Sequence, residues 1–367
     1  MVAGHERIPV FDVLVTDDDV AAVDAVLASG NPGMSAEAER FEREFAEHLG
    51  VEHVVALSSC TAALHVACLE AGIGPGDEVI VPALTFVATA AAVRYSGGTP
   101  VFCDLVDTET LQIDPDAVEA AIGERTKAVL AVHFAGYAAA ADRLREICDE
   151  RGIAFLEDAA HVPVASLGGR APGGFGRSGC FSFFSNKVLA CGEGGALSTD
   201  DPDVAAFARA VRGGEAPGRG ELGPALNYRL DDARAALLLS RWRRLSDEIE
   251  SRRLHVRRYF ELLADVDGLS VPFANEEVSN SSGYLMTVLV DPERRREIRA
   301  DLLSEHGIQT TIFPAIHELT AYRELHPGLS LPHTEHVARA HIVLPLFPHM
   351  TEGQQDRIVE SLAAAIG

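Results

Sequence analysis

Lysine is rare in this chain, and one of its two lysines lies in a setting suited to covalent chemistry. Among 31 Lys and Arg residues, only Lys127 and Lys187 are lysines. Lys187 follows an apolar run and precedes the glycine-rich segment 192–195. A guanidinium stays protonated, whereas a lysine amine can lose its proton and form a Schiff base. The competing interpretation is a surface lysine without a role, so the rest of the chain must decide.

Two other segments carry groups that could bind a charged ring compound. The segment Ser58–Leu64 follows a predicted strand with small hydroxyl residues and then opens a helix, which is typical of an anion site. Asp158 ends another predicted strand, where a carboxylate could hold a protonated ring nitrogen. Taken singly, each could be an ordinary helix cap. Together with Lys187 they predict a pyridoxal 5′-phosphate pocket, because that cofactor needs an amine, phosphate donors and an acid for its ring nitrogen.

Short apolar strands alternate with helical patterns between about residues 54 and 199, and they would position these groups. The predicted strands are Val54–Leu57, Glu78–Pro82, Pro100–Cys103, Ala128–His133, Ala154–Glu157, Cys180–Phe184 and Gly195–Ser198. Near-continuous apolar strands separated by helices indicate a mostly parallel sheet covered on both faces. The loop that carries Lys187 is too short for a crossover helix, so one of the last two strands should run antiparallel.

Helical patterns flank this region and suggest the domain organisation. Helices are predicted at Thr16–Ala28, Glu37–Leu49 and Pro202–Arg212, and one long helical stretch at Asp231–Leu263. From Val271 onward the pattern reads strand, helix, strand, helix. We therefore expect an N-terminal segment and large α/β domain over residues 1–245, and a smaller α+β domain over residues 246–367.

Composition argues against several classes of partner. The net charge of −24 disfavours nucleic acid and anionic lipid surfaces. No apolar run reaches the roughly 20 residues that span a bilayer, and the first ten residues lack a signal-peptide pattern, so a cytoplasmic location is expected. The six cysteines form no Cys-x-x-Cys pair, so we expect buried free thiols and no metal site.

With these motifs in hand, the chain resembles the DegT/DnrJ/StrS sugar aminotransferases, a branch of the fold-type I pyridoxal phosphate enzymes. The motifs that carry the resemblance are Gly72–Pro82, Thr85-Phe86, Glu157–His161, Phe181-Ser182-Phe183 with Lys187, Gly192–Gly195 and Asn227–Arg229. The resemblance extends from Phe41 to the C-terminal helix. It implies a large domain with a mostly parallel seven-stranded sheet, a smaller C-terminal α+β domain, and an amino group transferred to a sugar ketone.

The resemblance also implies roles for individual residues. Lys187 would form the Schiff base with the cofactor and later move the substrate proton. Asp158 would pair with the ring nitrogen of the cofactor, His161 would lie near its phenolic oxygen, and Phe86 would stack on its ring face. Its phosphate would be held by Thr61, Ala62 and Ser182, and Cys60 is a further expected cofactor-binding residue. Asn227 would reach the phosphate in the neighbouring subunit, which implies a homodimer with shared sites. Glu193, Arg229 and His317 would face the substrate.

The chain departs from the family in two places. Cys60 stands where the family usually has glycine, which would be strained if that position needed a positive φ. The segment Gly213–Leu226, which in the family helps to build the sugar site, is short and glycine-rich. The cofactor contacts are otherwise complete, so the second departure affects the substrate more than the cofactor.

Three functions follow, in order of preference. The first is an aminotransferase that moves an amino group from Glu or Gln to a nucleotide-linked keto-deoxysugar, in secondary metabolism or glycan synthesis. The second keeps the cofactor but acts on a keto-cyclitol or another small metabolite, or catalyses elimination or carbon–nitrogen bond formation. The third is a cofactor-binding partner subunit without turnover. The family's sugar dehydratases carry His in place of the lysine, so Lys187 argues against that branch.

Overall fold

A seven-stranded sheet forms the centre of the protein. The computed structural model describes residues 6–213 and 226–367. In the sheet, the strands lie in the order β1-β7-β6-β5-β4-β2-β3. Their bounds are β1 His53–Leu57, β2 Glu78–Pro82, β3 Thr99–Cys103, β4 Thr126–Val132, β5 Ala154–Asp158, β6 Ser178–Ser182 and β7 Gly195–Thr199. All seven strands predicted from the sequence are present, each within about two residues of its predicted ends.

One strand of this sheet is reversed, as the short Lys187 loop predicted. The neighbours β2–β3, β2–β4, β4–β5 and β5–β6 are all parallel. Strand β7 pairs antiparallel with both β6 and β1. The chain therefore leaves β6 at the carboxyl edge of the sheet, makes the Lys187 loop there, and returns along β7.

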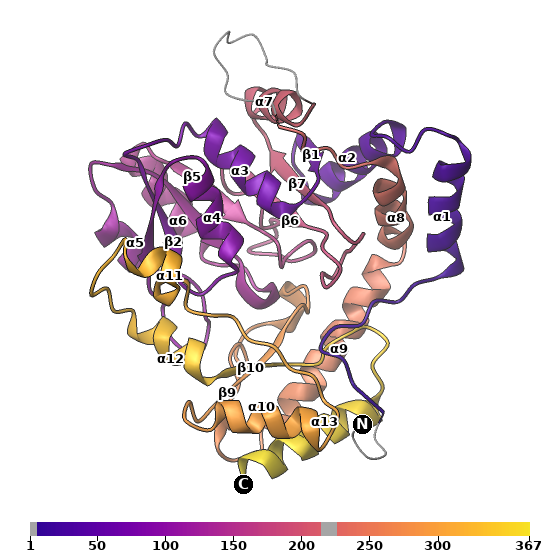
Figure 1. The fold of residues 1–367 in the computed structure, drawn as a ribbon, viewed down its shortest axis with the longest axis vertical. Coiled ribbons are helices and arrows are strands. Elements are labelled where there is room, and N and C mark those ends of the chain that lie inside the picture. Colours follow the sequence, from indigo (N-terminus) through magenta and orange to yellow (C-terminus); the bar gives the residue numbers. More distant parts are fainter. Residues whose placement is uncertain (1–5, 214–225) are drawn as a thin grey trace.

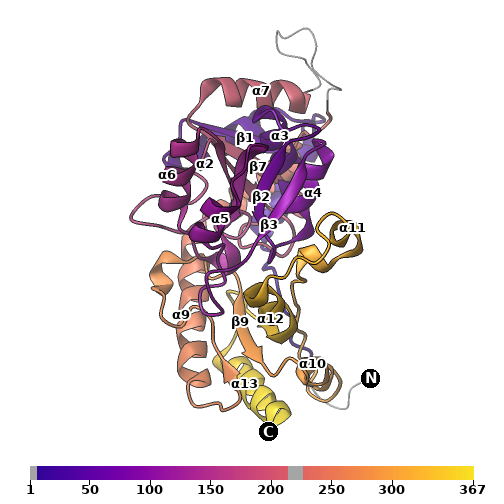
Figure 2. The same ribbon diagram turned by 90° about the vertical axis from the view of Figure 1, so that its left-hand side faces the viewer.

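Helices cover both faces of the sheet (Figures 1 and 2). Alternating residues of the strands meet different helices. Val79 and Val81 pack with α3, α4 and α7, whereas Ile80 between them packs with α5 and α6 on the other face. Beyond β1, the same second face is covered by α2 and α8. The helices are α2 Ala36–Leu49, α3 Cys60–Glu70, α4 Val87–Tyr95, α5 Pro115–Ala121, α6 Ala141–Arg151, α7 Pro202–Gly213 and α8 Asp232–Trp242. Burial on both faces explains the near-continuous apolar strands.

The predicted helix Asp231–Leu263 is wrong as a single element. The structure has α8 and a second helix, α9 (Leu245–Leu263), separated at Arg243 and Arg244. Arg244 takes φ −109° and ψ 0° before the new helix starts. Its guanidinium binds both carboxylate oxygens of Asp19, at 2.7 and 2.8 Å, and Glu248 at 2.7 Å. The helical periodicity does not report this break, because its cause is a tertiary ion pair.

A smaller antiparallel sheet lies at the far end of α9 (Figures 1 and 2). Its strands are β8 Leu269–Ser270, β9 Met286–Val290 and β10 His341–Leu344, in the order β10-β9-β8. Helices α10 (Arg295–Ser304) and α13 (Glu352–Ile366) follow β9 and β10, which confirms the predicted strand–helix order. The prediction missed α11 (Thr320–Arg323) and α12 (Pro332–Ala340) between them. The α/β architecture with a second, smaller sheet is confirmed.

The N-terminal segment crosses the expected domain boundary. Ile8 forms a parallel bridge with Ile308 and is buried in the core of the small sheet. Leu346 also donates its N–H to the Val10 carbonyl at 3.2 Å. The first described residues therefore pack with the C-terminal part of the chain, although the prediction grouped them with the large domain. The boundary near residue 245 itself stays a prediction.

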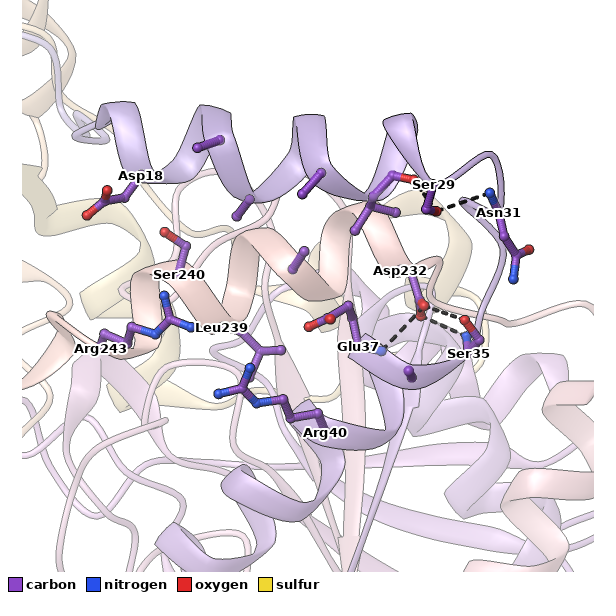
Figure 3. A pocket seen from close by; sticks show the side chains of 16 residues that line it. Asp18, Ser29, Asn31, Ser35, Glu37, Arg40, Asp232, Leu239, Ser240 and Arg243 are labelled. Carbon is purple, nitrogen blue, oxygen red and sulfur yellow. Dashed lines mark hydrogen bonds between the residues drawn. The ribbon is translucent and has the colours of Figure 1, made fainter.

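Helix α1 (Asp17–Ala28) lies outside α2 and α8 and leaves a groove of about 720 Å³ between the three helices (Figure 3). At one end of the groove, Asp232 accepts from the Ser35 N–H at 2.7 Å and the Ala38 N–H at 3.1 Å. Ser35 makes no cap bond of its own, so Asp232 caps α2 from the start of α8. None of the residues predicted to do chemistry lines this groove, and we assign it a structural role.

The structure also bears on what composition predicted about the cysteines and about membrane-spanning segments. All six cysteines are buried and unpaired, as expected. Within residues 6–213 and 226–367, no helix is long and apolar enough to cross a membrane.

Candidate active site

A cavity of about 300 Å³ opens at the carboxyl edge of the large sheet. Its walls come from the segments that follow β1, β2, β4, β5 and β6, with two aromatic residues from the C-terminal part. Eight of the residues predicted from the sequence line it: Cys60, Thr61, Phe86, Asp158, His161, Ser182, Lys187 and Glu193. The topology thus brings together groups that are more than 130 positions apart in the chain, at the edge where α/β sheets bind ligands.

Asp158 forms the floor of the cavity at the end of β5. Its carboxylate is buried and accepts from Thr89 Oγ1 at 2.8 Å and from the Ala160 N–H at 3.2 Å. Burial raises the pKa of Asp158 above its usual value, although these hydrogen bonds and the Lys187 charge oppose that effect. A cationic N–H placed against the carboxylate would favour its ionised form and be held by it.

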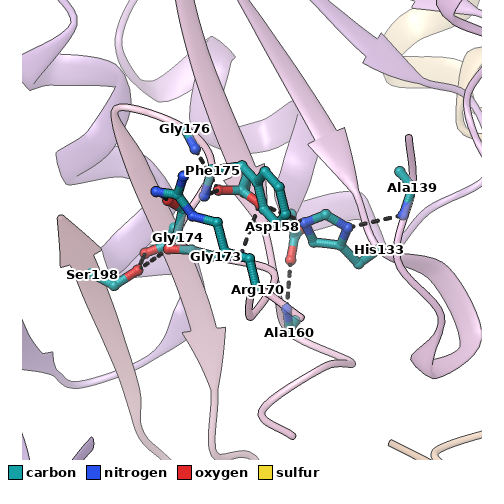
Figure 4. A network of polar contacts seen from close by, with 12 residues as sticks. His133, Ala139, Asp158, Ala160, Arg170, Gly173, Gly174, Phe175, Gly176 and Ser198 are labelled. Carbon is teal, nitrogen blue, oxygen red and sulfur yellow. Dashed lines mark hydrogen bonds and ion pairs between the residues drawn. The ribbon is translucent and has the colours of Figure 1, made fainter. Parts of the chain in front are cut away.

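Glu157 precedes Asp158 on β5, so its side chain lies on the opposite face of the strand. Figure 4 shows the polar contacts in this region, which involve His133 and the turn at Gly173–Gly176. The Glu157 side chain is fully buried and accepts from the N–H groups of Gly173, Phe175 and Gly176 at 2.8, 2.7 and 2.6 Å. His133 completes the set, with Nε2 at 2.9 Å from Oε2. Because His133 Nδ1 accepts from a backbone N–H at 3.0 Å, its proton must be on Nε2. All four groups that contact Glu157 are therefore donors.

Lys187 lies on a tight turn between β6 and β7. The turn is closed by the Lys187 N–H, which donates to the Phe184 carbonyl at 2.9 Å. The side chain is half-buried, and Nζ lies 4.5 Å from the centre of the Tyr284 ring. Neighbouring Asn186 also lines the cavity, with a buried Oδ1 that has no partner among the described residues. The loop therefore presents an amine and an unused acceptor to the same space.

The start of α3 forms the anion-binding end of the cavity. Ser59 caps the helix by accepting from the Ala62 N–H at 3.1 Å, and Thr61 faces the cavity in its first turn. Gly195 is required here, since a Cβ at that position would lie 2.3 Å from the Ser59 carbonyl carbon. Ser182, at the end of β6, lines the same cavity. The arrangement combines free N–H groups, hydroxyls and a helix N-terminus, which favours a phosphate.

Cys60 is not strained, which resolves one departure from the family. It is the first residue of α3, and among the described residues positive φ outside glycine occurs only at Leu111, Ala135 and Phe273. Its Sγ lies 4.0 Å from Asp158 Oδ1. Burial raises the pKa of the Cys60 thiol well above its usual range, so the group stays protonated beside the carboxylate.

His161 and Phe86 both line the cavity, but His161 is buried whereas Phe86 is largely exposed. His161 is buried among Phe134, Tyr284 and Phe313, and its Nδ1 has no partner among the described residues. Burial, together with the Lys187 charge, lowers the pKa of His161 well below its usual value, so the ring is neutral. Phe86, by contrast, is 60% exposed at the cavity mouth.

Four of the predicted residues do not line this cavity, and three of them are Asn227, Arg229 and His317. Asn227 is exposed, and so is Arg229, whose Nη1 donates to the Gly213 carbonyl at 2.8 Å. His317 is buried elsewhere, with its ring against Phe102. Its Nε2 lies 3.5 Å from Glu335 Oε1. Within one chain, none of the three faces Lys187, so their predicted roles depend on a second subunit or on substrate.

Ala62 and the short loop complete the predicted set. Ala62 is buried in α3, and its backbone N–H, not its side chain, contributes to the cap at Ser59. The shortened segment Gly213–Leu226 lies almost entirely outside the described residues, since the structure describes only its first and last positions.

Sequence reasoning missed several residues that complete the site. Thr89 lies in the first turn of α4, and Tyr284 and Phe313 come from the distant C-terminal part. No local motif marks Tyr284 or Phe313. Thr89 had a signal, because it is a small hydroxyl residue among the alanines at the start of this helix, and a buried hydroxyl needs a partner.

The residues present fit pyridoxal 5′-phosphate. A buried carboxylate, an unpartnered His161 Nδ1, a helix N-terminus and a lysine amine face one cavity. These are the acid, phenolic-oxygen, phosphate and aldehyde partners that the cofactor needs. The fold and the site together define a fold-type I pyridoxal phosphate enzyme.

Comparison with known proteins gives the family. The model of the DegT/DnrJ/EryC1/StrS aminotransferase family matches residues 14–363. The chain belongs to this family and is a pyridoxal phosphate-dependent aminotransferase. Sequence reasoning named this family correctly.

Solved structures agree over almost the whole chain. An aminotransferase, TlmJ from Streptoalloteichus hindustanus, is 35% identical with a TM-score of 0.92, and the match covers 98% of this chain and 99% of that one. DesV from S. venezuelae, solved in complex with a ketimine intermediate, is 35% identical with a TM-score of 0.89 and 98% coverage of both chains. DesI, solved in the presence of its TDP-sugar product, is 32% identical with a TM-score of 0.92, covering 100% of this chain and 94% of that one.

Proposed function

We propose that this protein transfers the amino group of Glu or Gln to a keto group of a nucleotide-linked keto-deoxysugar. Membership of a sugar aminotransferase family supports a sugar acceptor. The likeness to DesI, whose product is a TDP-sugar, supports the nucleotide-linked form. Such an enzyme would serve the synthesis of amino sugars for secondary metabolites, including antibiotics, or for glycans, in the cytoplasm.

The observation that carries the proposal is the placement of Lys187 and Asp158 on one cavity, with the start of α3 beside them. Bound pyridoxal phosphate supplies an electron sink for the carbon that loses its proton. Asp158 holds the charge that this sink requires, and Thr89 fixes the carboxylate orientation through its 2.8 Å hydrogen bond. The first turn of α3, with Thr61 and Ser182, binds the phosphate.

The remaining groups move a proton, donate or accept a hydrogen bond, or exclude water. Lys187 would carry a proton at Nζ between the substrate Cα and the cofactor carbon on one side of the cavity. His161, which is neutral, offers a hydrogen bond without adding charge beside Lys187. Buried Phe134 and Tyr284, with partly buried Phe313, keep bulk water away from that side. Water exclusion strengthens the electrostatic interactions of the lysine and the aspartate.

A homodimer completes this proposal. Phe86 and Phe184 are 60% and 43% exposed at the cavity, which is unusual for phenylalanine beside a catalytic lysine. A second copy would cover them and bring an exposed Asn227 toward the neighbouring phosphate site. Glu193, exposed on the cavity rim, and Arg229 and His317 would then be candidates for substrate contact.

A keto-cyclitol, or another small ketone, is the second candidate acceptor. The observation that favours it is the short glycine-rich segment Gly213–Leu226, which leaves less chain to build a nucleotide-sugar wall. A chemistry other than transamination, such as elimination, belongs to the same candidate. The cofactor site would be unchanged in each case.

The test is a two-stage assay on purified protein loaded with pyridoxal phosphate. L-Glu and L-Gln are first added alone, and the loss of the visible cofactor band reports amino transfer to the cofactor. A panel of TDP- and UDP-linked keto-deoxysugars and keto-cyclitols is then offered, and products are identified by mass spectrometry. An aminated nucleotide sugar is the expected product, and Lys187→Ala should give none. An unchanged band with both donors would refute transamination, whereas amination of cyclitols alone would select the second candidate.

A further inference from the structure

Tyr284 places an aromatic face against the catalytic amine. Lys187 Nζ lies 4.5 Å from the centre of the Tyr284 ring, within the range of a cation–π interaction. Tyr284 is 1% exposed and lines the same cavity as Asp158. We propose that Tyr284 is a positioning residue whose ring face holds the Lys187 ammonium whenever this amine is not bonded to the cofactor.

The backbone around Tyr284 is tied to the large sheet. The Ser282 N–H donates to the Gly136 carbonyl at 2.9 Å, and the Leu285 N–H donates to the Ala135 carbonyl at 3.1 Å. Gly136 has φ +104°, and a Cβ there would lie 2.6 Å from Ser282 Oγ. Ala135 has φ 60°, which is uncommon for a residue with a side chain. This close crossing fixes a C-terminal residue at the edge where β4 ends.

Two rings then fix the orientation of Tyr284. Phe11 stacks on it with centroids 5.7 Å apart and planes 11° apart. His161 contacts it at 4.5 Å with a tilt of 42°. With neighbours of this kind, the ring cannot turn away without breaking a buried stack. The face offered to Lys187 is therefore part of the folded structure before any ligand enters.

Other charged groups near the amine do not substitute for the ring. In the described part of the chain, no carboxylate lies within 4.0 Å of the Lys187 ammonium. The titratable groups around it are Asp158 below, the protonated Cys60 thiol, neutral His161 and Glu193 on the rim. Arg252, which is buried and has no carboxylate partner within 4.0 Å among residues 6–213 and 226–367, donates to the carbonyl of Gly283 next to Tyr284 at 3.4 Å. The Tyr284 ring, with its centre 4.5 Å from Nζ, is the aromatic face that the ammonium contacts.

A consequence for chemistry follows. The ring attracts the ammonium and not the neutral amine, so it keeps the charged Nζ at a defined place. A released Lys187 amine that stays at the cavity wall can either return its proton or bond to the cofactor again. The inference rests on the proposed cofactor chemistry of Lys187 but not on the identity of the acceptor.

The test measures cofactor capture by the protein freed of its cofactor. Pyridoxal phosphate is added at a series of pH values, and the rate of Schiff-base absorbance is recorded, since only the neutral amine reacts. Removing the ring with Tyr284→Leu should move the pH of half-maximal rate down by about 0.5 to 1 unit. Tyr284→Phe should leave it nearly unchanged. Capture needs no amino donor or acceptor, so failure of the sugar proposal would not affect this result.

A fluorinated series separates the electronic effect from packing. Phenylalanine and its mono- and trifluoro forms, incorporated at position 284, keep the ring's shape while weakening its negative face. The pH of half-maximal rate should fall stepwise along the series. Tyr137→Leu is the matched control, because Tyr137 is also buried and stacked, on Phe273 at 4.4 Å, but does not line the cavity. A midpoint that is the same for the wild type, the Leu variant and all fluorinated forms would overturn the proposal.

Discussion

Replacing Glu157 by Gln tests whether the site rests on its buried acceptor network. Each carboxylate oxygen of Glu157 accepts from two donors, Oε1 from Phe175 and Gly176 and Oε2 from Gly173 and His133. Glutamine has one oxygen and one NH₂ group. Whichever way the amide is turned, its NH₂ must face two donors, so two hydrogen bonds are lost without replacement.

The expected cost can be worked from these contacts. Hydrogen bonds to a charged group contribute about 1.5–3 kcal/mol each, so losing two costs about 3–6 kcal/mol. An unfolding entropy of about 2.1 cal/mol/K per residue then converts this cost into a melting temperature lower by roughly 4–8 °C for a chain of this length. The loss should also loosen Asp158, whose backbone is continuous with Glu157.

The assay compares Glu157→Gln with Glu70→Gln in calorimetry of the cofactor-free protein. Glu70 is a fair control because it makes a bidentate pair with Arg177, with both contacts at 2.7 Å, but the arginine side chain is 40% exposed. Such a surface pair contributes at most about 1 kcal/mol. Equal and small shifts for the two variants would refute the assignment of four donors to Glu157. A second readout, the affinity for pyridoxal phosphate, should fall for Glu157→Gln only.

Three further predictions concern stability and the site. Burial alone would raise the pKa of Asp19, but hydrogen bonds from two arginines, Ser240 and a backbone N–H lower this pKa to about 2. The ionised carboxylate should therefore contribute about 2 kcal/mol to the free energy of unfolding. This contribution should be complete above about pH 4 and be lost as the pH falls toward 2. Urea titrations of Asp19→Asn should accordingly show a flatter pH profile between 4 and 2, and a slope equal to that of the wild type would contradict the ion pairs. Gly195→Ala should lose phosphate affinity at least tenfold, measured with pyridoxal phosphate, because its Cβ would meet Ser59, whereas Gly123→Ala has open space and should bind normally. Lys187→Arg should retain the fold by circular dichroism but form no Schiff base on addition of the cofactor, and a visible adduct would show that another amine reacts.

The large sheet was predictable because its strands leave a strong local pattern. Each of the seven is an apolar run bounded by turn residues, since both faces are buried. The reversed β7 also followed from local information, the length of the Lys187 loop. The predictions that failed concerned features that are set by contacts between residues far apart in the sequence. The break before Leu245 is set by Asp19 more than 200 positions away, and α12 begins where Asp104 caps it from the large sheet.

The same distinction between local patterns and distant contacts applies at the candidate active site. Asp158 and Lys187 carry recognisable motifs, and the structure places both at one cavity. Tyr284 carries no motif, because its position depends on the contact of Ser282 and Leu285 with the turn after β4. For His317 the substrate role stays a prediction. Its motif suggested the substrate, but within one chain the residue is buried beside Phe102.

The bridge between the N-terminal segment and the small sheet limits how the protein can be divided. Ile8 donates its N–H to the Gly307 carbonyl at 3.0 Å and accepts from the Gln309 N–H at 2.9 Å, so it serves as an extra strand residue for the C-terminal part. A fragment containing only residues 246–367 would lose that partner and expose an apolar slot in its core. A peptide that restores the segment around Ile8 should rescue such a fragment in trans. The segments around Ile8 and Ile308, 300 positions apart, must therefore meet before the apolar core of the C-terminal part is complete, which makes this core a late step in folding.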